Sequence, residues 1–257
     1  MRIDVHAHIT DNKLIADYDR IVSNMEKDGL LNIIDTGSSR ESSEIAYEHA
    51  QKYNHIYCAV GIHPECALEA TSLDYARFKE MYKNEKVVAI GEIGLDYYYK
   101  TNPPKEEQIR VFNEQIELAY ELNAPIVVHV RDAYGDALKI LNENKSKLNG
   151  VLLHCYSGSK ELVREFGRLD TYFSLGGVVT FKNAKEKPEV IKAIPIERLL
   201  LETDSPYMAP EPFRGTINEP KNTFYVAKKI AEVLNKEQQA IEEITTQNAR
   251  RLFKKLI

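Results

Sequence analysis

The chain has 257 residues, of which 43% are hydrophobic and 28% are charged, and its formal net charge at pH 7 is -5. This length allows one large domain or two ordinary ones, and the composition is typical of a globular protein, which excludes a disordered chain. The negative charge argues against a general basic groove for long nucleic acid, although bound cations can create a local positive site.

The cysteines and the N-terminal residues indicate the cellular compartment of the protein. Cys58, Cys66 and Cys155 are too few and too irregularly spaced for a disulfide framework or a zinc finger, and an odd number is typical of a reducing compartment. No secretory signal precedes the first strand-like residues, and no apolar run approaches the roughly 20 residues that span a bilayer. We therefore expect a cytoplasmic protein with no membrane association and no obligate protein partner.

The first segment, residues 3–9, is an expected strand whose side chains alternate between two faces. One face carries Asp4, His6 and His8, and the other carries Ile3, Val5, Ala7 and Ile9. Two imidazoles on one face, one pleat repeat apart, can reach a single metal ion. This strand therefore favours a metal site, the alternative being a pair of solvent-facing or otherwise satisfied histidines.

Helix-like and strand-like segments then alternate along the whole chain. Further strands are expected at residues 30–35, 55–62, 86–92, 125–130, 151–154, 171–175 and 199–204. Helices are expected at residues 11–27, 43–53, 73–82, 109–122, 137–141, 161–169 and 223–234, with two short ones around 241–244 and 249–253. Eight strands at about this length predict a single-domain α/β protein, a (β/α)8 TIM barrel over residues 1–257. The alternative is an open doubly wound sheet, but no glycine-rich dinucleotide loop follows an early strand.

Residues able to bind metal lie at the C-terminal ends of these expected strands. They are His6, His8, Glu92, His129, His154 and Asp204. In a barrel these strand ends face one mouth, so residues distant in sequence converge there. Each has an ordinary alternative, such as a core histidine with backbone partners or a turn-forming carboxylate. A shared cation would satisfy all of them at once, which favours a metal centre.

Several ordered blocks carry a family resemblance. They are Asp4-Val5-His6-Ala7-His8, Gly61-Ile62-His63-Pro64, Ala89 to Tyr97, Val128 to Arg131, His154 to Gly158, Glu202 to Tyr207, Asn218-Glu219-Pro220 and Asn248 to Phe253. Over essentially its whole length the chain resembles the TatD family of metal-dependent hydrolases, related to the amidohydrolase superfamily. The resemblance implies that His6, His8 and Asp204 hold one divalent ion, that His129 and His154 hold a second, and that Glu92 bridges them.

The chain departs from this family at two positions. Members often have a histidine where this chain has Glu65 and a phenylalanine where it has Tyr156. Neither departure touches the inferred ligands, but Glu65 is a candidate for altered substrate preference at the mouth. The fourth strand ends in Glu92 rather than in a carboxylated lysine, which disfavours phosphotriesterase or dihydroorotase chemistry.

We hypothesise a deoxyribonuclease that cleaves the phosphodiester bonds of DNA from an end, the substrate being a strand end or a small phosphate ester. A hydroxide held between two ions about 3.5–4 Å apart would attack phosphorus, with Asp204 as proton acceptor. Arg131 and His63 are candidates to contact phosphate oxygens. Tyr97, in a loop with Tyr98 and Tyr99, is a candidate to stack on a base. The alternatives are a surface salt bridge for Arg131, a turn position for His63 and local packing for the tyrosines.

The sequence is compatible with several metal ions and with more than one type of cleaved bond. Histidine-rich ligation suits Zn, Mn, Fe or Ni, whereas a Mg site normally has fewer imidazoles, although nuclease assays in the family commonly invoke Mg. One rival is an ester or amide hydrolase, including an enzyme that removes an aminoacyl group from tRNA. The other rival is a non-catalytic binding barrel, which the complete ligand set disfavours.

Lys182, Lys185 and Lys187 are expected on a solvated helix face, the alternative being a role in holding an acidic strand.

Overall fold

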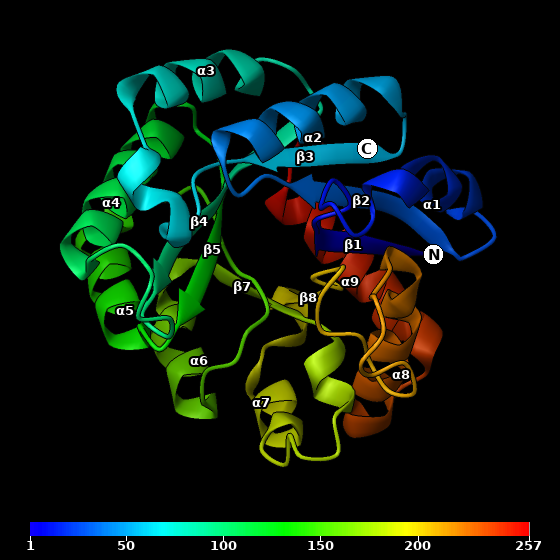
Figure 1. Ribbon diagram of the computed structural model, residues 1–257. Coiled ribbons are helices and arrows are strands. Elements are labelled where there is room, and N and C mark those ends of the chain that lie inside the picture. Colours follow the sequence, from blue (N-terminus) through cyan, green and yellow to red (C-terminus); the bar gives the residue numbers. More distant parts are fainter. Residues whose placement is uncertain (257) are drawn as a thin grey trace.

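Eight parallel strands form the centre of the molecule, and each pairs with its neighbours in chain order. The computed structural model describes residues 1–256. The strands are Arg2–Ala7 (β1), Leu30–Thr36 (β2), Ile56–Val60 (β3), Val87–Asp96 (β4), Ile126–Arg131 (β5), Val151–Leu153 (β6), Thr171–Leu175 (β7) and Leu199–Leu201 (β8). Because β1 also contacts β8, the sheet forms a nearly closed barrel (Figure 1). The predicted (β/α)8 TIM barrel is confirmed; residue 257, the end of the expected domain, lies outside the described residues.

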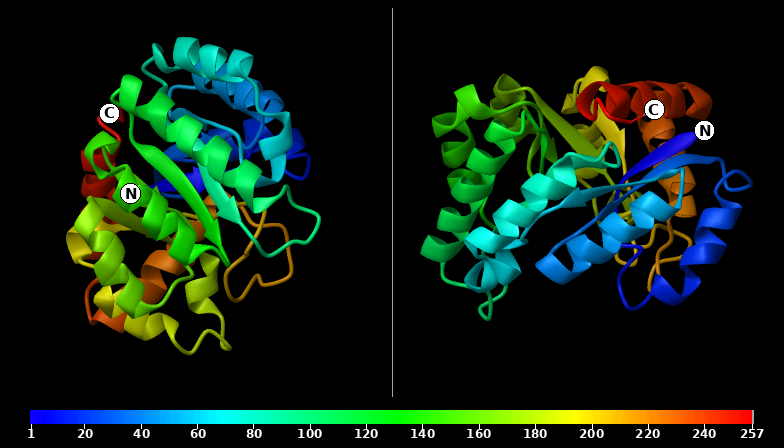
Figure 2. Two further views of the ribbon diagram at one scale, coloured as in Figure 1. Left: turned by 90° about the vertical axis from the view of Figure 1, so that its left-hand side faces the viewer. Right: turned by 90° about the horizontal axis from the view of Figure 1, so that it is seen from above.

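Helices connect the strands and lie around the outside of the barrel (Figure 2). The α-helices are Tyr18–Asn24 (α1), Arg40–Lys52 (α2), Ser72–Tyr82 (α3), Lys105–Glu121 (α4), Tyr134–Glu143 (α5), Lys160–Phe166 (α6), Lys187–Ala193 (α7), Thr223–Leu234 (α8) and Gln238–Leu252 (α9). Short 3-10 helices are Ile15–Asp17, Pro64–Glu69, Lys145–Lys147, Gly167–Leu169, Gly177–Thr180, Ile196–Arg198 and Pro220–Asn222. Within the described residues, every helix is too short or too polar to cross a membrane.

The strands are buried on both faces. One apolar cluster fills the barrel interior and takes a side chain from every strand: Ile3 and Val5, Ile34, Tyr57 and Ala59, Val88 and Ala89, Val127, Leu152, Tyr172 and Leu200. A second cluster joins outward strand residues such as Ile33 and Phe173 to helix residues such as Phe78 and Phe112. Burial on both faces explains why the strands are continuous apolar runs in the sequence.

The C-terminal helix α9 closes the end of the barrel opposite the mouth. Leu252 and Phe253 belong to the interior cluster, and the side-chain amide of Asn248 donates to the carbonyl oxygen of Leu199, at the start of β8 (2.9 Å). The expectation of two short helices here is wrong, because residues 238–252 form one helix. Thr245, a polar residue between the two expected helices, is buried and donates its hydroxyl proton to the carbonyl oxygen of Ile241 (2.8 Å).

The first strand departs from simple alternation. Ile3 and Val5 pack in the interior cluster, whereas Ala7 and Ile9 pack in the outer one, so the expected single apolar face is wrong. The pairing of β1 with β2 shifts register between Asp4 and Ala7, which interrupts the alternation.

The segment after β1 also differs from the sequence prediction. A helix was expected over residues 11–27, but the α-helix α1 begins only at Tyr18. Residues before it turn at the barrel mouth, where the backbone N–H of Asp11 donates to the carbonyl oxygen of His8 (3.0 Å).

Candidate metal centre

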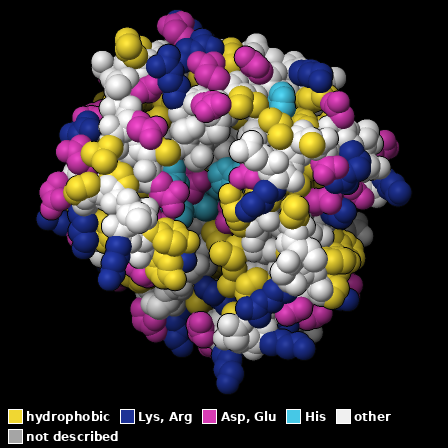
Figure 3. Space-filling view, in the orientation of Figure 1, with side chains coloured by type: hydrophobic (Ala, Val, Ile, Leu, Met, Phe, Trp, Pro, Cys, Tyr) yellow, Lys and Arg dark blue, Asp and Glu magenta, His cyan; other side chains and the backbone are white. Residues whose placement is uncertain are grey.

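The six predicted ligands meet at the mouth of the barrel. His6, Glu92 and His129 lie within β1, β4 and β5. His8 and His154 follow directly after β1 and β6, and Asp204 is the third residue after β8. A cavity of about 800 Å³ opens over them. Figure 3 shows histidine and acidic side chains at the bottom of a central hollow. The structure therefore brings together residues that are spread over nearly the whole sequence.

The first group of donors surrounds one oxygen of Glu92. Oε2 of Glu92 lies 3.5 Å from Nε2 of His6 and 3.4 Å from Nε2 of His8. Oδ1 of Asp204 lies 3.7 and 3.6 Å from the same two nitrogens. The two imidazole nitrogens are 3.2 Å apart. Four potential ligand atoms thus face one point.

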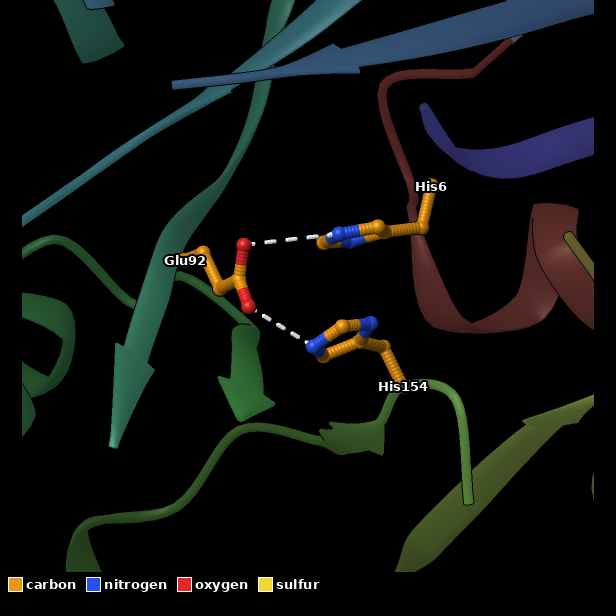
Figure 4. Close-up of side chains that lie close together, drawn as sticks. All are labelled: His6, Glu92 and His154. Atoms are coloured by element: carbon orange, nitrogen blue, oxygen red, sulfur yellow. Dashed lines mark ion pairs between the residues drawn. The ribbon is translucent and has the colours of Figure 1, made fainter. Parts of the chain in front are cut away.

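The second group surrounds the other oxygen of Glu92. Oε1 lies 2.7 Å from Nε2 of His154 and 2.9 Å from Nδ1 of His129, and these two nitrogens are 3.2 Å apart. Figure 4 shows the carboxylate of Glu92 with one oxygen toward His6 and the other toward His154. This is the arrangement that a bridging carboxylate requires.

Backbone and carboxylate partners fix two of the imidazoles. Nδ1 of His8 donates to the carbonyl oxygen of Thr36 (2.7 Å), so Nε2 is free to act as a ligand. Nε2 of His129 donates to Asp96 (3.0 Å), which leaves Nδ1 facing Glu92. Gly94 allows β4 to lie this close to β5, because a Cβ at its φ of +138° would overlap the carbonyl oxygen of His129. Such outer contacts orient metal ligands and set their tautomers.

The pKa values of the two carboxylates in the predicted ligand set, Glu92 and Asp204, are lowered. Burial raises the pKa of Glu92, but the surrounding imidazoles, His154 foremost, outweigh burial and hold the pKa well below its usual value. The pKa of Asp204 is likewise lowered, because nearby His8 and the other imidazoles outweigh burial. For His129 burial lowers the pKa, whereas Asp96 and Glu92 raise it to about 9. Without a metal ion, the positive charge of protonated histidines such as His129 balances the negative charge of the carboxylates.

This donor set fits divalent metal ions. Imidazole nitrogens and carboxylate oxygens converge at distances that require a shared proton or a shared cation. Nδ1 of His154 and Nδ1 of His6 are buried with no hydrogen-bond partner among the described residues. The structure shows the geometry of these residues, and their role as ligands stays a prediction.

His63 is close to the same carboxylate but is oriented differently. Its Nε2 lies 3.5 Å from Oε1 of Glu92. Its Nδ1 accepts a hydrogen bond from the backbone N–H of Glu65 (3.2 Å). Burial lowers the pKa of His63 to about 3, so the ring is neutral and its proton is on Nε2. A protonated nitrogen donates a hydrogen bond and cannot bind a metal ion, which favours the predicted contact with substrate.

Arg131 and Glu65 line the cavity, whereas Tyr97 does not. The hydroxyl of Tyr97 donates to Asp136 (2.9 Å), outside the cavity, which weakens its predicted stacking role. Tyr99 lines the cavity instead. The guanidinium of Arg131 stacks on the rings of Tyr98 and Tyr99, at 3.7 and 5.0 Å from their centroids.

Two carboxylates with a place in the site were missed in the sequence. Asp96 orients His129, as described above. Glu202 is fully buried, with Oε1 3.9 Å from Nδ1 of His154 and Oε2 accepting from the hydroxyl of Ser174. Burial raises the pKa of Glu202 to about 7. The available signal was position, since Asp96 ends the strand that carries Glu92, and Glu202 follows β8 two residues before Asp204.

The sequence pattern described as TatD related DNase matches residues 3–254. This chain belongs to the TatD-related DNase family. It is 44% identical over 254 residues to a Bacillus subtilis protein described as uncharacterized metal-dependent hydrolase YabD, with 99% of each chain covered. It is 34% identical over 258 residues to the 3'-5' ssDNA/RNA exonuclease TatD of Cronobacter sakazakii, and this match covers 98% of this chain and 97% of that protein. The predicted family and the general class, a metal-dependent hydrolase, are confirmed.

Solved TatD structures share the fold. The crystal structure of YJJV, a TatD homologue from Escherichia coli K12, matches with a TM-score of 0.92 at 27% identity and covers 98% of both chains. The two departures from the TatD pattern occupy different places in this structure. Glu65 faces the cavity, whereas Tyr156 is buried and donates its hydroxyl proton to the carbonyl oxygen of Ser159 (2.8 Å).

Proposed function

We propose that this protein is a two-metal phosphodiesterase that releases nucleotides from the end of a DNA strand. The observation that carries the proposal is the position of Glu92 between two separate groups of donors. One oxygen faces His6 and His8, and the other faces His129 and His154. Divalent ions bound there would supply Lewis acidity and lower the pKa of water, which hydrolysis of a phosphodiester requires.

The side chains of this protein have distinct tasks in the proposed reaction. Asp204 is ionised and sits at the edge of the first group, where it accepts the proton of the attacking water. Glu92 holds the two groups at a fixed separation. His63 donates from Nε2 to a phosphoryl oxygen, and charge that develops on this oxygen strengthens the hydrogen bond.

The cavity also offers contacts for a nucleotide. The guanidinium of Arg131, in contact with the rings of Tyr98 and Tyr99, pairs with a phosphate oxygen through its planar fork. Tyr99 lines the cavity and is 46% exposed, so its ring is accessible to a base. The name of the Cronobacter relative, a 3'-5' ssDNA/RNA exonuclease, supports a strand end as substrate.

The ligand chemistry limits the choice of metal ion. Four imidazoles among the donors favour Zn, Mn, Fe or Ni, and Mg is retained as a candidate for nuclease assays. Cys58, Cys66 and Cys155 are all free, which supports a reducing compartment, the cytoplasm, as the place of action.

The test compares end-labelled single-stranded DNA cleavage by the wild type and Asp204→Asn, each loaded with Mn or Zn. The wild type is expected to release mononucleotides, and Asp204→Asn is expected to lose at least about a hundredfold in kcat, as for removal of a general base. Asp136→Asn, which alters a carboxylate outside the cavity, is the matched control and should keep its activity. An Asp204→Asn variant as fast as the control would contradict the assignment.

A second candidate is a metal-dependent hydrolase of esters or amides, such as an aminoacyl-tRNA deacylase. The observation in its favour is the presence of Asp11, Glu41 and Glu65 in the cavity lining. Carboxylates in the lining would attract the amino group of an aminoacyl ester. Release of amino acid from aminoacyl-tRNA without nucleotide release would select this candidate. A protein that cleaves neither substrate when loaded with metal would indicate the non-catalytic barrel.

A further inference from the structure

The mouth of the barrel has two sides of opposite charge. The segments that follow β1, β2 and β3 line the cavity with Asp11, Glu41 and Glu65. The described lining residues on this side include no Lys or Arg, and the cation Lys13 lies beside them, over the ring of Tyr207. The loops after β7 and β8 begin at the mouth and carry Lys182, Lys185 and Arg214 at exposed positions. A polyanion is therefore attracted more strongly to the second side than to the first.

These cations and Lys228, on the adjacent helix α8, form what we call the basic rim: Lys182, Lys185, Arg214 and Lys228. All are exposed, and none has an ion-pair partner among residues 1–256, whereas neighbouring Lys229 pairs with Glu232. Of the five carboxylates on the same loops, Glu202 and Asp204 face the metal centre and Glu219 pairs with Arg20 and Lys221. Glu186 and Glu211 remain, so the rim keeps an excess of positive charge in a chain with a net charge of -5. Figure 3 shows Lys and Arg side chains below the central hollow, over the region of α7 and the loops that lead to α7 and α8 in Figure 1.

The two loops of the basic rim pack against each other and reach the cavity. The guanidinium of Arg214 lies over the ring of Phe181 (4.3 Å), and its Nη1 donates to Asn183 (3.4 Å). Gly177 packs against the backbone of Met208, where a Cβ would overlap the carbonyl oxygen. Met208 and Tyr207 line the cavity of the metal centre. The basic rim is thus continuous with the catalytic mouth.

Exposed apolar side chains accompany these cations. Tyr207, Met208 and Phe213 are 41%, 43% and 38% exposed, and all belong to the loop after β8. Cations that follow a backbone, together with rings on which bases stack, are the features that bind single-stranded nucleic acid. A duplex would present its bases stacked on one another and unable to use these rings.

From these observations we propose that the basic rim is an exosite for a single-stranded nucleic acid, holding the part of the strand that extends beyond the nucleotide in the metal centre. The inference rests on the proposed function and deepens it, because it assigns the direction in which the strand leaves the active site. Long single strands bind through the rim, whereas a dinucleotide occupies only the cavity. This explains how a chain of negative charge engages a polyanion.

The test uses a quadruple variant of the basic rim, with Lys182, Lys185, Arg214 and Lys228 each changed to Gln. The matched control changes four exposed lysines at the opposite end of the barrel to Gln: Lys27, Lys145, Lys236 and Lys254. Both variants remove the same charge. Binding of a fluorescent phosphorothioate single strand of about 12 nucleotides, within the usual site sizes, is measured by anisotropy on Mn-loaded protein at several salt concentrations.

The rim variant is expected to bind the strand at least about tenfold more weakly than the control, with a salt slope smaller by up to about 3, since each phosphate contact to a single strand contributes about 0.7. Its cleavage of a dinucleotide should equal that of the wild type. Equal binding by the rim variant and the control would overturn the exosite. Wild-type protein that binds the strand through the rim but cleaves no phosphodiester would retain the exosite and overturn the proposed function.

Discussion

Asp96 accepts a hydrogen bond from Nε2 of His129 across 3.0 Å, and this contact turns Nδ1 of His129 toward Glu92. Asp96 itself is held by the backbone N–H of Tyr98 (2.9 Å), so the acceptor cannot move away. One carboxylate outside the ligand set thereby selects which nitrogen of His129 faces the metal centre. In the pairing of β4 with β5, Gly94 lies opposite His129 and Asp96 lies opposite Arg131.

Asp96→Asn is expected to weaken metal binding by the second group of donors by about 10–100-fold, as for other partners of metal-bound histidines. The amide is a poorer acceptor and can turn its NH₂ group toward the imidazole. Isothermal titration with Zn or Mn measures the loss. Asp136→Asn is the control, and an Asp96→Asn protein with unchanged affinity would show that Asp96 does not orient His129.

His63→Ala is expected to lower kcat by about 10²–10³ while leaving the metal content unchanged, because the side chain is assigned as a donor to substrate and not as a ligand. The measurement pairs single-stranded DNA hydrolysis with elemental analysis of the same sample. Loss of one ion per chain in His63→Ala would contradict the tautomer deduced from its contact with Glu65.

Metal affinity is expected to rise with pH. In the ion-free protein the pKa of His129 is raised to about 9, so below pH 9 this imidazole carries a proton that a metal ion must displace. Affinity therefore falls by about tenfold per pH unit, for each proton displaced, as the pH decreases from 9 toward 6. Calorimetry in buffers of different ionisation enthalpy counts the protons released. A metal affinity that does not change with pH over this range would show that no proton on His129 is displaced by the metal ion.

Phe253→Ala is expected to lower the free energy of unfolding by about 3–5 kcal/mol, because it opens a cavity where α9 closes the barrel interior. Phe253 is 0% exposed, and it packs with interior residues of the strands. Leu73→Ala, at a side chain that is 69% exposed, is the control and should change stability by less than about 0.5 kcal/mol. Urea denaturation compares the two variants, and an equal effect would show that α9 does not contribute to the core.

The sequence was sufficient to predict the barrel and the convergence of its polar strand ends. Apolar runs buried on both faces are visible in the sequence, and the closure of the barrel then places Glu92 and Asp204 together without further information. Alternation was less reliable, since the register shift in β1 separates Val5 from Ala7 although both lie at odd positions. Such shifts depend on the neighbouring strand and leave no local pattern.

Contacts of side chains outside the predicted ligand set with distant segments were not predictable. Glu202 gains its place only because β8 lies beside β7, which brings it to Ser174, and because the chain after β6 brings His154 within 3.9 Å. Lys187 was expected on a solvated face, yet it is buried, and its Nζ donates to the carbonyl oxygen of Tyr156 (3.4 Å). Lys182 and Lys185 are exposed as expected, but they lie in the loop before α7 and not on a helix face. A lysine has a long apolar stem, so its burial depends on the packing partner.

Elemental mass spectrometry of the wild type and Glu92→Gln tests the central claim most directly. Glu92 is assigned as the carboxylate shared by two groups of donors, so the wild type should contain two divalent ions per chain after reconstitution. Glu92→Gln should retain at most one and lose hydrolysis of single-stranded DNA. Wild-type protein that binds no ion, or a Glu92→Gln variant that keeps both ions and full activity, would contradict the account.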